Sequence, residues 1–587
     1  ISSNNGLMSL GDIKNHSANI SASTLKSLVK KGILKTLKET FFKKFDLEQN
    51  ILKSTDKTLT VGQNKILEQM ESAEKPILLH GITGSGKTEI YLRKIIEVIK
   101  NGKQAILMVP EIALTPQIIQ YFKGYFGDSI ALFHSKLSDG ERAKEWWKVK
   151  TGNCPLVIGS RSAIFAPVSN LGLVILDEEH EWTYKQESTP YYQTHKVAEE
   201  LCKLHNADLI FGSATPKAET YKKAREGDYL YLNLPEKIYK SNPSKIHIVD
   251  LREEFQKRNF SIFSLKLQNK IRERLEKKEQ IILFINQRGM ANAVVCRDCG
   301  FTEKCPNCEI SLKLHNVRVG TILGSSLQCH YCNFKKDPPL ICPDCRSPHI
   351  KNIGVGTQRV EGEVHKLFPE AKVIRADSDT TGKNDGFAKI YHDFLNHKYD
   401  ILVGTQMITK GLDFKNVSLI GIILADIGLH IPDFRSSERL FQILTQVAGR
   451  CGRRENPGEV ILQTYNPNHP TIKKVADYAY NDFMESELKI RSKLNYPPYN
   501  RIIKFTVVGR DQKRLADHIK IEKEVLEDIF NINNLEVKIM TSPAMVYKKA
   551  NLYYYHVILR SSNPGIAFNY WKPPKTWRID VDPVNTA

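Results

Sequence analysis

The sequence predicts an α/β protein built on two lobes, each with a parallel β-sheet. Two series of short apolar runs alternate with helical stretches, and runs of the first series end in Gly, Ser, Pro or an acid. An open parallel sheet places its ligand-binding loops at such strand ends. The first series is ILLH at 77–80, AILMVP at 105–110, PLVIGS at 155–160, LVILDEEH at 173–180 and DLIFGSATP at 208–216. The second series is IILFINQRG at 281–289, AKVIRAD at 371–377, DILVGTQM at 400–407, VSLIGIILAD at 417–426 and GEVILQTY at 458–465. Both series have the pattern of a RecA-like lobe.

At 587 residues the chain is longer than one hydrophobic core usually serves, so several domains are expected. Residues after 468 mix helix and strand signals and indicate a further α+β domain. We expect a winged-helix-like DNA-binding segment at 1–57, lobe 1 at 58–235, the start of lobe 2 at 236–290, a cysteine insert at 291–351, the rest of lobe 2 at 352–466 and a C-terminal α+β domain at 467–587.

The N-terminal segment predicts a helix over 24–32 that carries Leu25, Leu28 and Val29 and ends at Gly32. Its basic residues can either contact DNA or form a solvated helix face, and we weigh the two interpretations evenly. These residues are Lys26, Lys30, Lys31 and Lys35. Position beside the two predicted α/β lobes favours DNA contact.

The charge balance points to a polyanionic partner, because the formal net charge is +20. Hydrophobic residues make up 41% and charged residues 26%, which is ordinary globular composition, and no apolar run is long enough to span a membrane. The chain begins at Ile1 and residues 1–20 lack the pattern of a secretory signal, so we expect a fragment of a cytoplasmic protein.

A phosphate loop of the pattern G-x-x-x-x-G-K-T follows the predicted strand 77–80 and precedes a predicted helix. Its members are Gly81, Ile82, Thr83, Gly84, Ser85, Gly86, Lys87 and Thr88. Backbone N–H groups of such a loop close on phosphate oxygens, the lysine neutralises the β and γ charges, and the threonine hydroxyl faces Mg²⁺. The sequence therefore predicts ATP and Mg²⁺ as cofactors.

Acidic residues follow the predicted strand ending at Leu176. Asp177 is predicted to hold Mg²⁺, and Glu178 to orient and polarise the attacking water. An isolated DEEH is often only a solvated strand end, but here it follows a complete phosphate loop. The segment GSATP at 212–216 offers hydroxyls that could link the nucleotide site to a bound strand.

The segment QVAGRCGR at 446–453 is predicted to open or lie within a helix of lobe 2. Arg450 and Arg453 are three residues apart and would fall on one helix face. Such arginines can stabilise charge on the γ-phosphate in the transition state, and Gln446 belongs to the same catalytic group. The alternative is a salt-bridged surface helix, which the other motifs make less favoured.

Four C-x-x-C pairs contain eight of the eleven cysteines. They are Cys296, Cys299, Cys305, Cys308, Cys329, Cys332, Cys342 and Cys345. Each pair supplies two thiolates, so four pairs predict two closed, structural zinc sites in a reducing compartment. Spacing alone leaves the pairing open, and His315 and His330 find no vacancy among the ligands. We expect the insert to hang outside the second lobe.

The segment 181–192 places aromatic rings among polar residues without a strict period. Its DNA-coupling candidates are Trp182, Tyr184, Lys185, Tyr191 and Tyr192. Exposed rings in such a loop can stack on the bases of single-stranded DNA without reading sequence. The alternative is that the rings are buried under the lobe as part of its core.

These motifs, together with VPEIALTPQ at 109–117, IGSRSAIFAP at 158–167 and GTQMITKGLDF at 404–414, resemble those of superfamily 2 helicases. Within that superfamily the chain is similar to the PriA family of bacterial replication-restart helicases over nearly its whole length. The resemblance implies 3′ to 5′ DNA unwinding at stalled forks and primosome assembly, with primosome proteins and single-strand-binding protein as partners. It also implies a monomer in the bacterial cytoplasm, associated with the nucleoid.

The same resemblance implies roles for individual residues. Gln63 would contact adenine, Gly411 and Asp413 would sense nucleotide from lobe 2, and Arg450 and Arg453 would act as arginine fingers. The zinc sites would be nested, the outer two cysteine pairs holding one ion and the inner two pairs the other. The aromatic loop would couple strand contact to hydrolysis.

The chain departs from the family pattern in two places. Too few residues precede the winged-helix segment for the usual domain that captures a 3′ end, and 20 residues separate Cys308 from Cys329, which suggests a long loop. A double-stranded DNA translocase and a DNA-binding scaffold with a vestigial ATPase are the alternatives. The scaffold is disfavoured because a vestigial ATPase should have lost at least one residue of its site. All five are intact: Lys87, Asp177, Glu178, Arg450 and Arg453.

Overall fold

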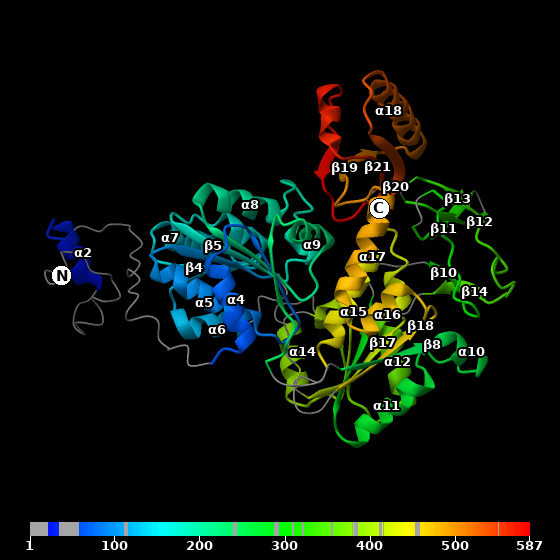
Figure 1. The fold of residues 1–587 in the computed structure, drawn as a ribbon, viewed down its shortest axis with the longest axis horizontal. Coiled ribbons are helices and arrows are strands. Elements are labelled where there is room, and N and C mark those ends of the chain that lie inside the picture. The colour runs from blue at the N-terminus through cyan, green and yellow to red at the C-terminus, as the bar shows by residue number, and fades with distance from the viewer. Residues whose placement is uncertain are drawn as a thin grey trace.

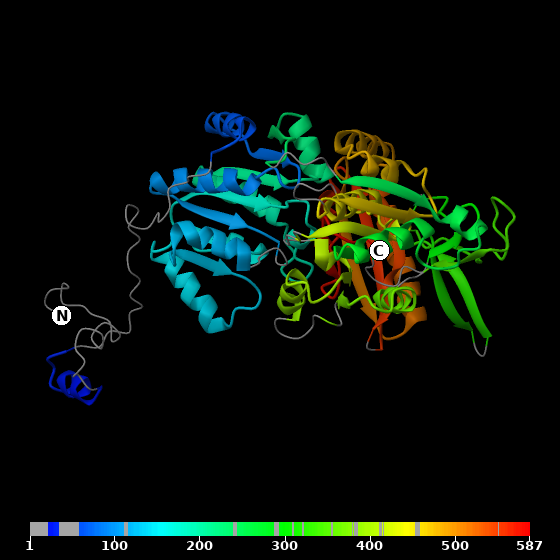
Figure 2. The same ribbon diagram turned by 90° about the horizontal axis from the view of Figure 1, so that it is seen from below.

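The fold described here is that of a computed structural model of the chain. The structure describes residues 22–34, 58–110, 116–238, 244–286, 293–307, 310–319, 322–330, 332–353, 356–377, 380, 386–409, 414, 416–451, 458–549 and 551–586. Figures 1 and 2 show two lobes side by side, with the C-terminal domain and the cysteine insert beside lobe 2.

Lobe 1 contains a seven-stranded parallel sheet in the order β3-β4-β2-β5-β6-β1-β7. Its strands are β1 (Ile77–Gly81), β2 (Gln104–Met108), β3 (Ile130–Phe133), β4 (Leu156–Gly159), β5 (Leu171–Asp177), β6 (Asp208–Ser213) and β7 (Leu230–Leu234). Its helices are α4 (Val61–Glu71), α5 (Lys87–Lys100), α6 (Pro116–Phe126), α7 (Asp139–Lys150), α8 (Thr194–His205) and α9 (Ala218–Arg225). The five predicted strands are confirmed. The two that sequence analysis missed, β3 and β7, are the sheet edges, where one side of a strand lacks a neighbour.

Lobe 2 contains a six-stranded parallel sheet in the order β15-β16-β9-β17-β18-β8. Its strands are β8 (Lys245–Asp250), β9 (Gln280–Ile285), β15 (Val373–Ala376), β16 (Ile401–Gly404), β17 (Val417–Ile423) and β18 (Glu459–Thr464). Its helices are α10 (Leu251–Gln256), α11 (Leu265–Glu276), α12 (Thr357–Leu367), α14 (Gly386–Leu395), α15 (Ser436–Ala448), α16 (Pro470–Ala476) and α17 (Tyr480–Lys493). The five predicted strands are again confirmed, and the missed strand β8 is an edge strand.

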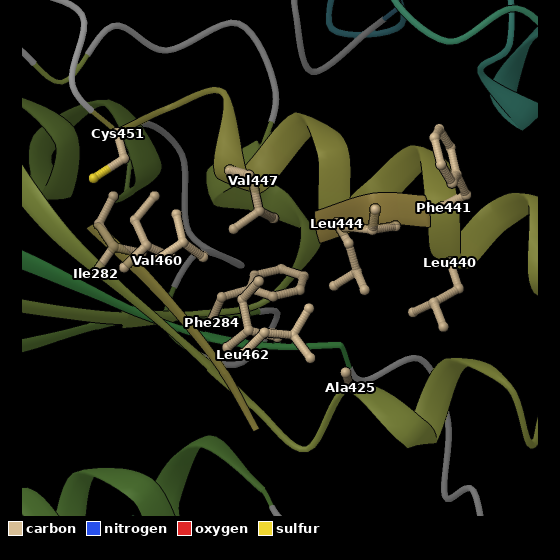
Figure 3. Packing of buried hydrophobic residues seen from close by; sticks show 14 of the residues in the cluster. Ile282, Phe284, Ala425, Leu440, Phe441, Leu444, Val447, Cys451, Val460 and Leu462 are labelled. Carbon is tan, nitrogen blue, oxygen red and sulfur yellow. The ribbon is translucent and has the colours of Figure 1, made fainter. Parts of the chain in front are cut away.

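The lobe 2 core lies where α15 covers one face of the sheet (Figure 3). Phe441 and Leu444 of α15 pack in the same cluster as Phe284 of β9 and Leu462 of β18, and all four side chains are almost fully buried. Burying apolar side chains of this size stabilises a fold by about 1.5–3 kcal/mol each. This packing, which extends to Cys451, holds the end of α15 in a fixed position on lobe 2.

Helices α16 and α17 also belong to lobe 2. Ile472, Phe483 and Leu488 are buried in the same core as α15. The expected boundary at residue 467 therefore falls too early, because these helices have apolar faces that pack on lobe 2. The separate C-terminal sheet begins only at β19, which starts at Arg501.

The C-terminal domain is α+β, as predicted. Its antiparallel strands occur in the order β20-β21-β19-β22, with bounds β19 (Arg501–Gly509), β20 (Lys538–Lys549), β21 (Leu552–Ser561) and β22 (Arg578–Val581). The long helix α18 (Gln512–Ile532) packs on the sheet through Leu515, Ile519, Leu526 and Phe530.

The cysteine insert contains two small antiparallel sheets. Strands β10 (Ala293–Cys296) and β14 (Ile350–Ile353) pair where the chain enters and leaves the insert. Strands β11 (Lys313–Val319) and β12 (Ile322–Gln328) form a hairpin, with β13 (Lys335–Lys336) beside β12. The hairpin accounts for the long stretch between Cys308 and Cys329.

The N-terminal helix α2 spans Ala22–Lys30 and confirms the predicted helix, with Gly32 in the left-handed region at φ +72° just after it. The rest of the expected winged-helix segment, including Lys35, lies outside the described residues, so that module stays a prediction. Across the described parts of the chain, no helix is long and apolar enough to cross a membrane.

Candidate nucleotide and metal sites

The phosphate loop joins β1 to α5. Gly84 and Gly86 have φ values of +85° and +86°, which residues other than glycine rarely adopt. A Cβ on Gly81 would lie 2.7 Å from the Ser85 hydroxyl oxygen and 3.0 Å from Cγ of Lys87. The glycines therefore let the loop close tightly around the start of α5, where Thr88 is partly exposed.

Lys87 is buried, and its Nζ donates to the carbonyl of Gly81 at 2.7 Å. The ammonium thus lies inside the loop, where phosphate oxygens would meet backbone N–H groups and the N-terminus of α5. The Ser85 hydroxyl is buried and makes no hydrogen bond to any residue that the structure describes. A buried hydroxyl without a partner could donate to an oxygen of an anionic ligand, which fits a phosphate-binding loop.

Gln63 supports the loop from α4. Its backbone N–H donates to the Thr60 hydroxyl at 3.2 Å and its Oε1 accepts from the Thr60 N–H at 3.0 Å, which forms a capping box. Its Nε2 lies 3.3 Å from the carbonyl of Ser85 and 3.4 Å from that of Gly86. The glutamine is therefore already engaged with the chain at both ends of its amide. Contact with adenine stays a prediction, and a pocket of about 270 Å³ lies between α4 and residues 231–236 beside it.

Asp177 ends β5 next to the loop. Its Oδ1 accepts from the Tyr91 hydroxyl at 2.9 Å, and its carbonyl accepts from the Tyr184 hydroxyl at 2.7 Å. Removal from water raises the pKa of Asp177 to about 6, and the charge of Glu178 adds to this rise while Lys87 opposes it. A divalent cation here would meet a carboxylate held in place by a tyrosine that sequence analysis did not single out.

Gly212 of β6 makes room for that tyrosine. A Cβ on Gly212 would lie 1.7 Å from the Tyr91 hydroxyl oxygen, so any larger residue would displace the ring from Asp177. The glycine of GSATP thus serves the acidic motif directly.

His180 connects three motifs. Its Nδ1 lies 2.7 Å from the Ser213 hydroxyl, its Nε2 lies 2.7 Å from Nε2 of Gln446, and Glu178 Oε2 is 3.6 Å away. An amide nitrogen can only donate, so the ring accepts at Nε2 and donates from Nδ1 to the serine. The acidic motif, the GSATP segment and lobe 2 therefore meet at one imidazole.

Glu179 has a structural role. It accepts from the Lys217 N–H and the Thr220 hydroxyl at 2.8 Å each, and His195 Nε2 lies 3.0 Å away. Burial alone would raise the pKa of Glu179, but the hydrogen bond from His195 and the charge of Lys217 outweigh it and lower the pKa. The third acidic residue of DEEH thus ties α8 and α9 to the sheet.

The lobe 2 arginine motif is arranged differently from the prediction. Helix α15 ends at Ala448, so Gln446 lies in its last turn and Arg450 follows the helix. The expectation that both arginines share one helix face is wrong, because the helix stops at Gly449. A Cβ on Gly449 would lie 3.2 Å from Cβ of Thr83, so the motif approaches the phosphate loop across the lobe interface. Arg453, Gly411 and Asp413 lie outside the described residues, and their roles stay predictions.

The aromatic segment forms a short hairpin. Lys185 pairs with Gln193, and the Gln186 N–H donates to the Tyr192 carbonyl at 2.9 Å. Trp182, Tyr191 and Tyr192 are partly exposed.

Within this hairpin, Tyr184 and Lys185 are buried. Base stacking is therefore wrong for Tyr184, whose ring lies in the lobe 1 core as the alternative interpretation expected.

Two residues of IGSRSAIFAP support this hairpin without having been predicted. Arg161 Nη1 donates to the carbonyls of Thr183 at 3.0 Å and Lys185 at 2.7 Å. Phe165 is 57% exposed, and its ring meets Tyr192 edge-on with centroids 5.0 Å apart. The sequence identified this motif as a whole through its resemblance to helicase motifs. The turn after β4 decides which of its side chains face solvent, and the sequence alone does not reveal that.

The outer cysteine pairs come together. The Sγ atoms of Cys296, Cys299, Cys342 and Cys345 all lie within 4.8 Å of one another, and two of the contacts measure 3.6 Å. Tetrahedral zinc with Zn–S bonds of about 2.3 Å places its sulfurs about 3.8 Å apart. This group could therefore hold one metal ion, in the nested arrangement that the family resemblance implied.

The inner pairs form a second group of Cys305, Cys329 and Cys332, while Cys308 lies outside the described residues. The four knuckles share one turn: the N–H of the first cysteine donates to the carbonyl five residues later, at 2.8 or 2.9 Å. The fourth residue after the first cysteine has a positive φ at Gly300, Asn333 and Arg346. This common backbone aims both thiols of a knuckle at one point. Neither group includes a histidine among the described residues.

The insert is docked on lobe 2, so the expectation that it hangs outside is wrong. A Cβ on Gly300 would lie 2.4 Å from the Tyr465 carbonyl, and Arg252 Nη1 donates to the Cys299 carbonyl at 3.2 Å. Tyr496 is buried in the same cluster as the cysteines. Close backbone contacts of this kind depend on glycine and could not be predicted from cysteine spacing.

Two family models match this chain. Residues 60–224 match the DEAD/DEAH box helicase model, and residues 351–455 match the helicase conserved C-terminal domain. The two sheets, the phosphate loop and the acidic motif that meets lobe 2 at His180 define a protein of the two-lobed helicase class.

The chain is 46% identical over 501 residues to replication restart protein PriA of Bacillus subtilis (strain 168), covering 84% of this chain and 62% of that protein. It is 37% identical over 590 residues to PriA of Chlamydia pneumoniae, covering 97% of this chain and 77% of that protein. The chain belongs to the PriA family of replication restart proteins.

The chain spans 62% of the length of the Bacillus subtilis relative and 65% of the length of replication restart protein PriA of Synechocystis sp.. Among solved structures, RecG bound to a three-way DNA junction matches with a TM-score of 0.41 and 17% identity over 82% of this chain and 49% of that one.

Proposed function

We propose that this chain is an ATP-dependent DNA helicase, moving 3′ to 5′, that acts at stalled or branched replication forks and restarts replication through primosome assembly. The observation that carries the proposal is the contact between His180 and Gln446, which joins the acidic motif of lobe 1 to lobe 2. A motor needs its second lobe to respond to nucleotide bound on the first, and this contact supplies the link.

The positions of the phosphate loop and the acidic motif support the following proposed roles. Lys87 and the loop bind the phosphates, Thr88 and Asp177 hold Mg²⁺, and Glu178 orients the attacking water. Arg450 would stabilise charge on the γ-phosphate from lobe 2, with Arg453, Gly411 and Asp413 assigned to nucleotide contact by family membership. Mg²⁺ would supply charge neutralisation between the β- and γ-phosphates.

We further propose DNA, primosome proteins and single-strand-binding protein as partners, a monomeric state, and a place in the bacterial cytoplasm near the nucleoid. The metal in both cysteine groups is proposed to be zinc, because thiolate-only sites of this shape suit a structural Zn²⁺ ion. The aromatic hairpin is proposed to contact the single strand through its exposed rings.

Replacing Lys87 with alanine is expected to abolish ATP hydrolysis and fork unwinding while DNA binding stays nearly intact, because the lysine is buried inside the phosphate loop. Steady-state ATPase, strand displacement on forked DNA and fluorescence anisotropy measure the three properties. The matched control is Lys203→Ala, which removes an exposed lysine from the same lobe. Turnover of Lys87→Ala above about a tenth of wild type would refute the role. A wild-type protein that hydrolyses ATP with DNA but separates no strands would favour a translocase instead.

Replacing Phe165 with alanine is expected to weaken binding of single-stranded DNA by about 1–3 kcal/mol, because its exposed ring beside Tyr192 offers a stacking surface. Anisotropy titrations across a salt series provide the measurement, and the salt dependence should not change because no charge is lost. Trp147→Ala serves as the control, since Trp147 is a 52% exposed aromatic on α7 of the same lobe. Equal losses in the two variants would remove Phe165 from the DNA path.

Replacing Cys305 and Cys308 together with serine is expected to lower the zinc content from two ions to one, because each site needs four thiolates. The Lys87-dependent ATPase should persist, since the nucleotide motifs lie outside the insert. Elemental analysis and ATPase assays are the readouts, and Cys154→Ser, a buried cysteine outside both groups, is the control. Retention of both ions would disprove the assignment of this pair.

A further inference from the structure

A short segment of the C-terminal domain crosses both lobes. Residues 580–586, called the strap here, continue from β22. On the lobe 1 side, Lys185 Nζ lies 2.8 Å from Oδ1 of Asp580 and donates to the Val581 carbonyl at 2.7 Å. Gln193 Nε2 donates to the Asp582 carbonyl at 3.2 Å. The strap therefore holds both strands of the aromatic hairpin.

On the lobe 2 side the strap meets residues just before and within α15. Arg439 Nη2 donates to the Val584 carbonyl at 2.5 Å, and Arg435 Nη1 donates to the same oxygen at 3.3 Å. The Thr586 N–H donates to Asp433 Oδ2 at 3.4 Å. Seven consecutive residues thus join the hairpin of lobe 1 to the helix that carries Gln446.

The central contact of the strap is a buried ion pair. The side chains of Lys185 and Asp580 are 5% and 12% exposed. A buried pair costs desolvation and adds little net stability, but removal of one partner leaves an uncompensated charge. Such a pair is better suited to fixing one arrangement of two segments than to strengthening the fold.

From Lys185 the path to the nucleotide site is short. Tyr184, its neighbour in the chain, donates its hydroxyl to the Asp177 carbonyl at 2.7 Å. Arg161 holds the carbonyl of Lys185 itself at 2.7 Å. A shift of Lys185 would therefore move the residue that braces Asp177.

We propose that Asp580 is a positioning residue for ATP hydrolysis: through Lys185 it fixes the aromatic hairpin relative to Asp177, so that DNA bound along the hairpin and the C-terminal domain accelerates hydrolysis. This inference rests on the proposed function, since it assumes an ATPase that DNA stimulates. The strap touches both lobes, so lobe movement during the ATP cycle must also move the hairpin.

The test compares basal and DNA-stimulated ATPase in the full chain carrying Asp580→Asn. We expect the ratio of stimulated to basal kcat to fall about fivefold or more. Basal kcat and KM for ATP should change less than about twofold, because Arg161 still holds the Lys185 carbonyl within lobe 1 when no DNA is bound. Lys185→Met should produce the same loss, and the double variant should be no worse than either single variant. Asp580→Glu, which keeps the carboxylate, should restore most of the stimulation.

Glu459→Gln is the matched control, because Glu459 pairs with Arg274 at 2.6 Å and Lys270 at 2.9 Å entirely within lobe 2. It should leave the stimulation ratio unchanged. Two results would overturn this inference while leaving the proposed function intact. In the first, Asp580→Asn lowers the basal and the stimulated rates in proportion. In the second, DNA stimulates the wild-type ATPase and the ratio of stimulated to basal kcat is the same in Asp580→Asn. A wild-type protein whose ATPase DNA does not stimulate would overturn the proposed function with it. Thermal unfolding of each variant identifies misfolded protein. If Asp580→Asn is misfolded, the stimulation ratio of Asp580→Glu decides whether the inference holds.

Discussion

The approach of the two lobes at the nucleotide site is the constraint on which the other features depend. Gly449 lies so close to Thr83 that a side chain there would press on the phosphate loop. Three residues earlier, Gln446 reaches His180 of the acidic motif. These contacts require the carboxyl ends of both parallel sheets to face one interface, and a shift of one helical turn in α15 would separate them.

A buried polar network supports that approach. Glu438 of α15 accepts from the Ala218 N–H of lobe 1 at 2.8 Å and from Arg491 Nη2 at 2.5 Å. Arg491 is 1% exposed and also pairs with Glu487 at 2.9 Å, while the Tyr480 hydroxyl donates to the Pro216 carbonyl at 2.9 Å. Buried charges of this kind are costly unless every partner is in place. The network therefore favours one relative position of the two lobes over other positions that would bury a similar apolar area.

The central strands could be predicted from the sequence because a strand covered on both faces is a continuous apolar run. The missed strands β3, β7 and β8 lie at sheet edges. Strands β7 and β8 carry polar residues that interrupt the apolar pattern, whereas β3 is an apolar run of only four residues. The places of the phosphate loop and the acidic motif along the chain could also be predicted, since both follow buried strands. Helices α16 and α17 were assigned to the wrong domain because their apolar faces do not reveal which core they join.

Other features depended on three-dimensional contacts that spacing does not encode. Tyr184 looked like its exposed neighbours, yet its hydroxyl finds a buried acceptor at Asp177. The end of α15 at Gly449 moved Arg450 off the helix, and only the lobe interface explains why a glycine stands there. The cysteine pairing followed from resemblance, whereas the docking of the insert on Tyr465 required the fold of lobe 2.

The contact between His180 and Gln446 can be tested most directly by a double-mutant cycle on DNA-stimulated kcat with the variants His180→Ala, Gln446→Ala and both together. If the two side chains act as one link between the lobes, the effects will be non-additive by about 1 kcal/mol or more. Effects that add to within about 0.5 kcal/mol would show that the two residues act independently and would contradict the account.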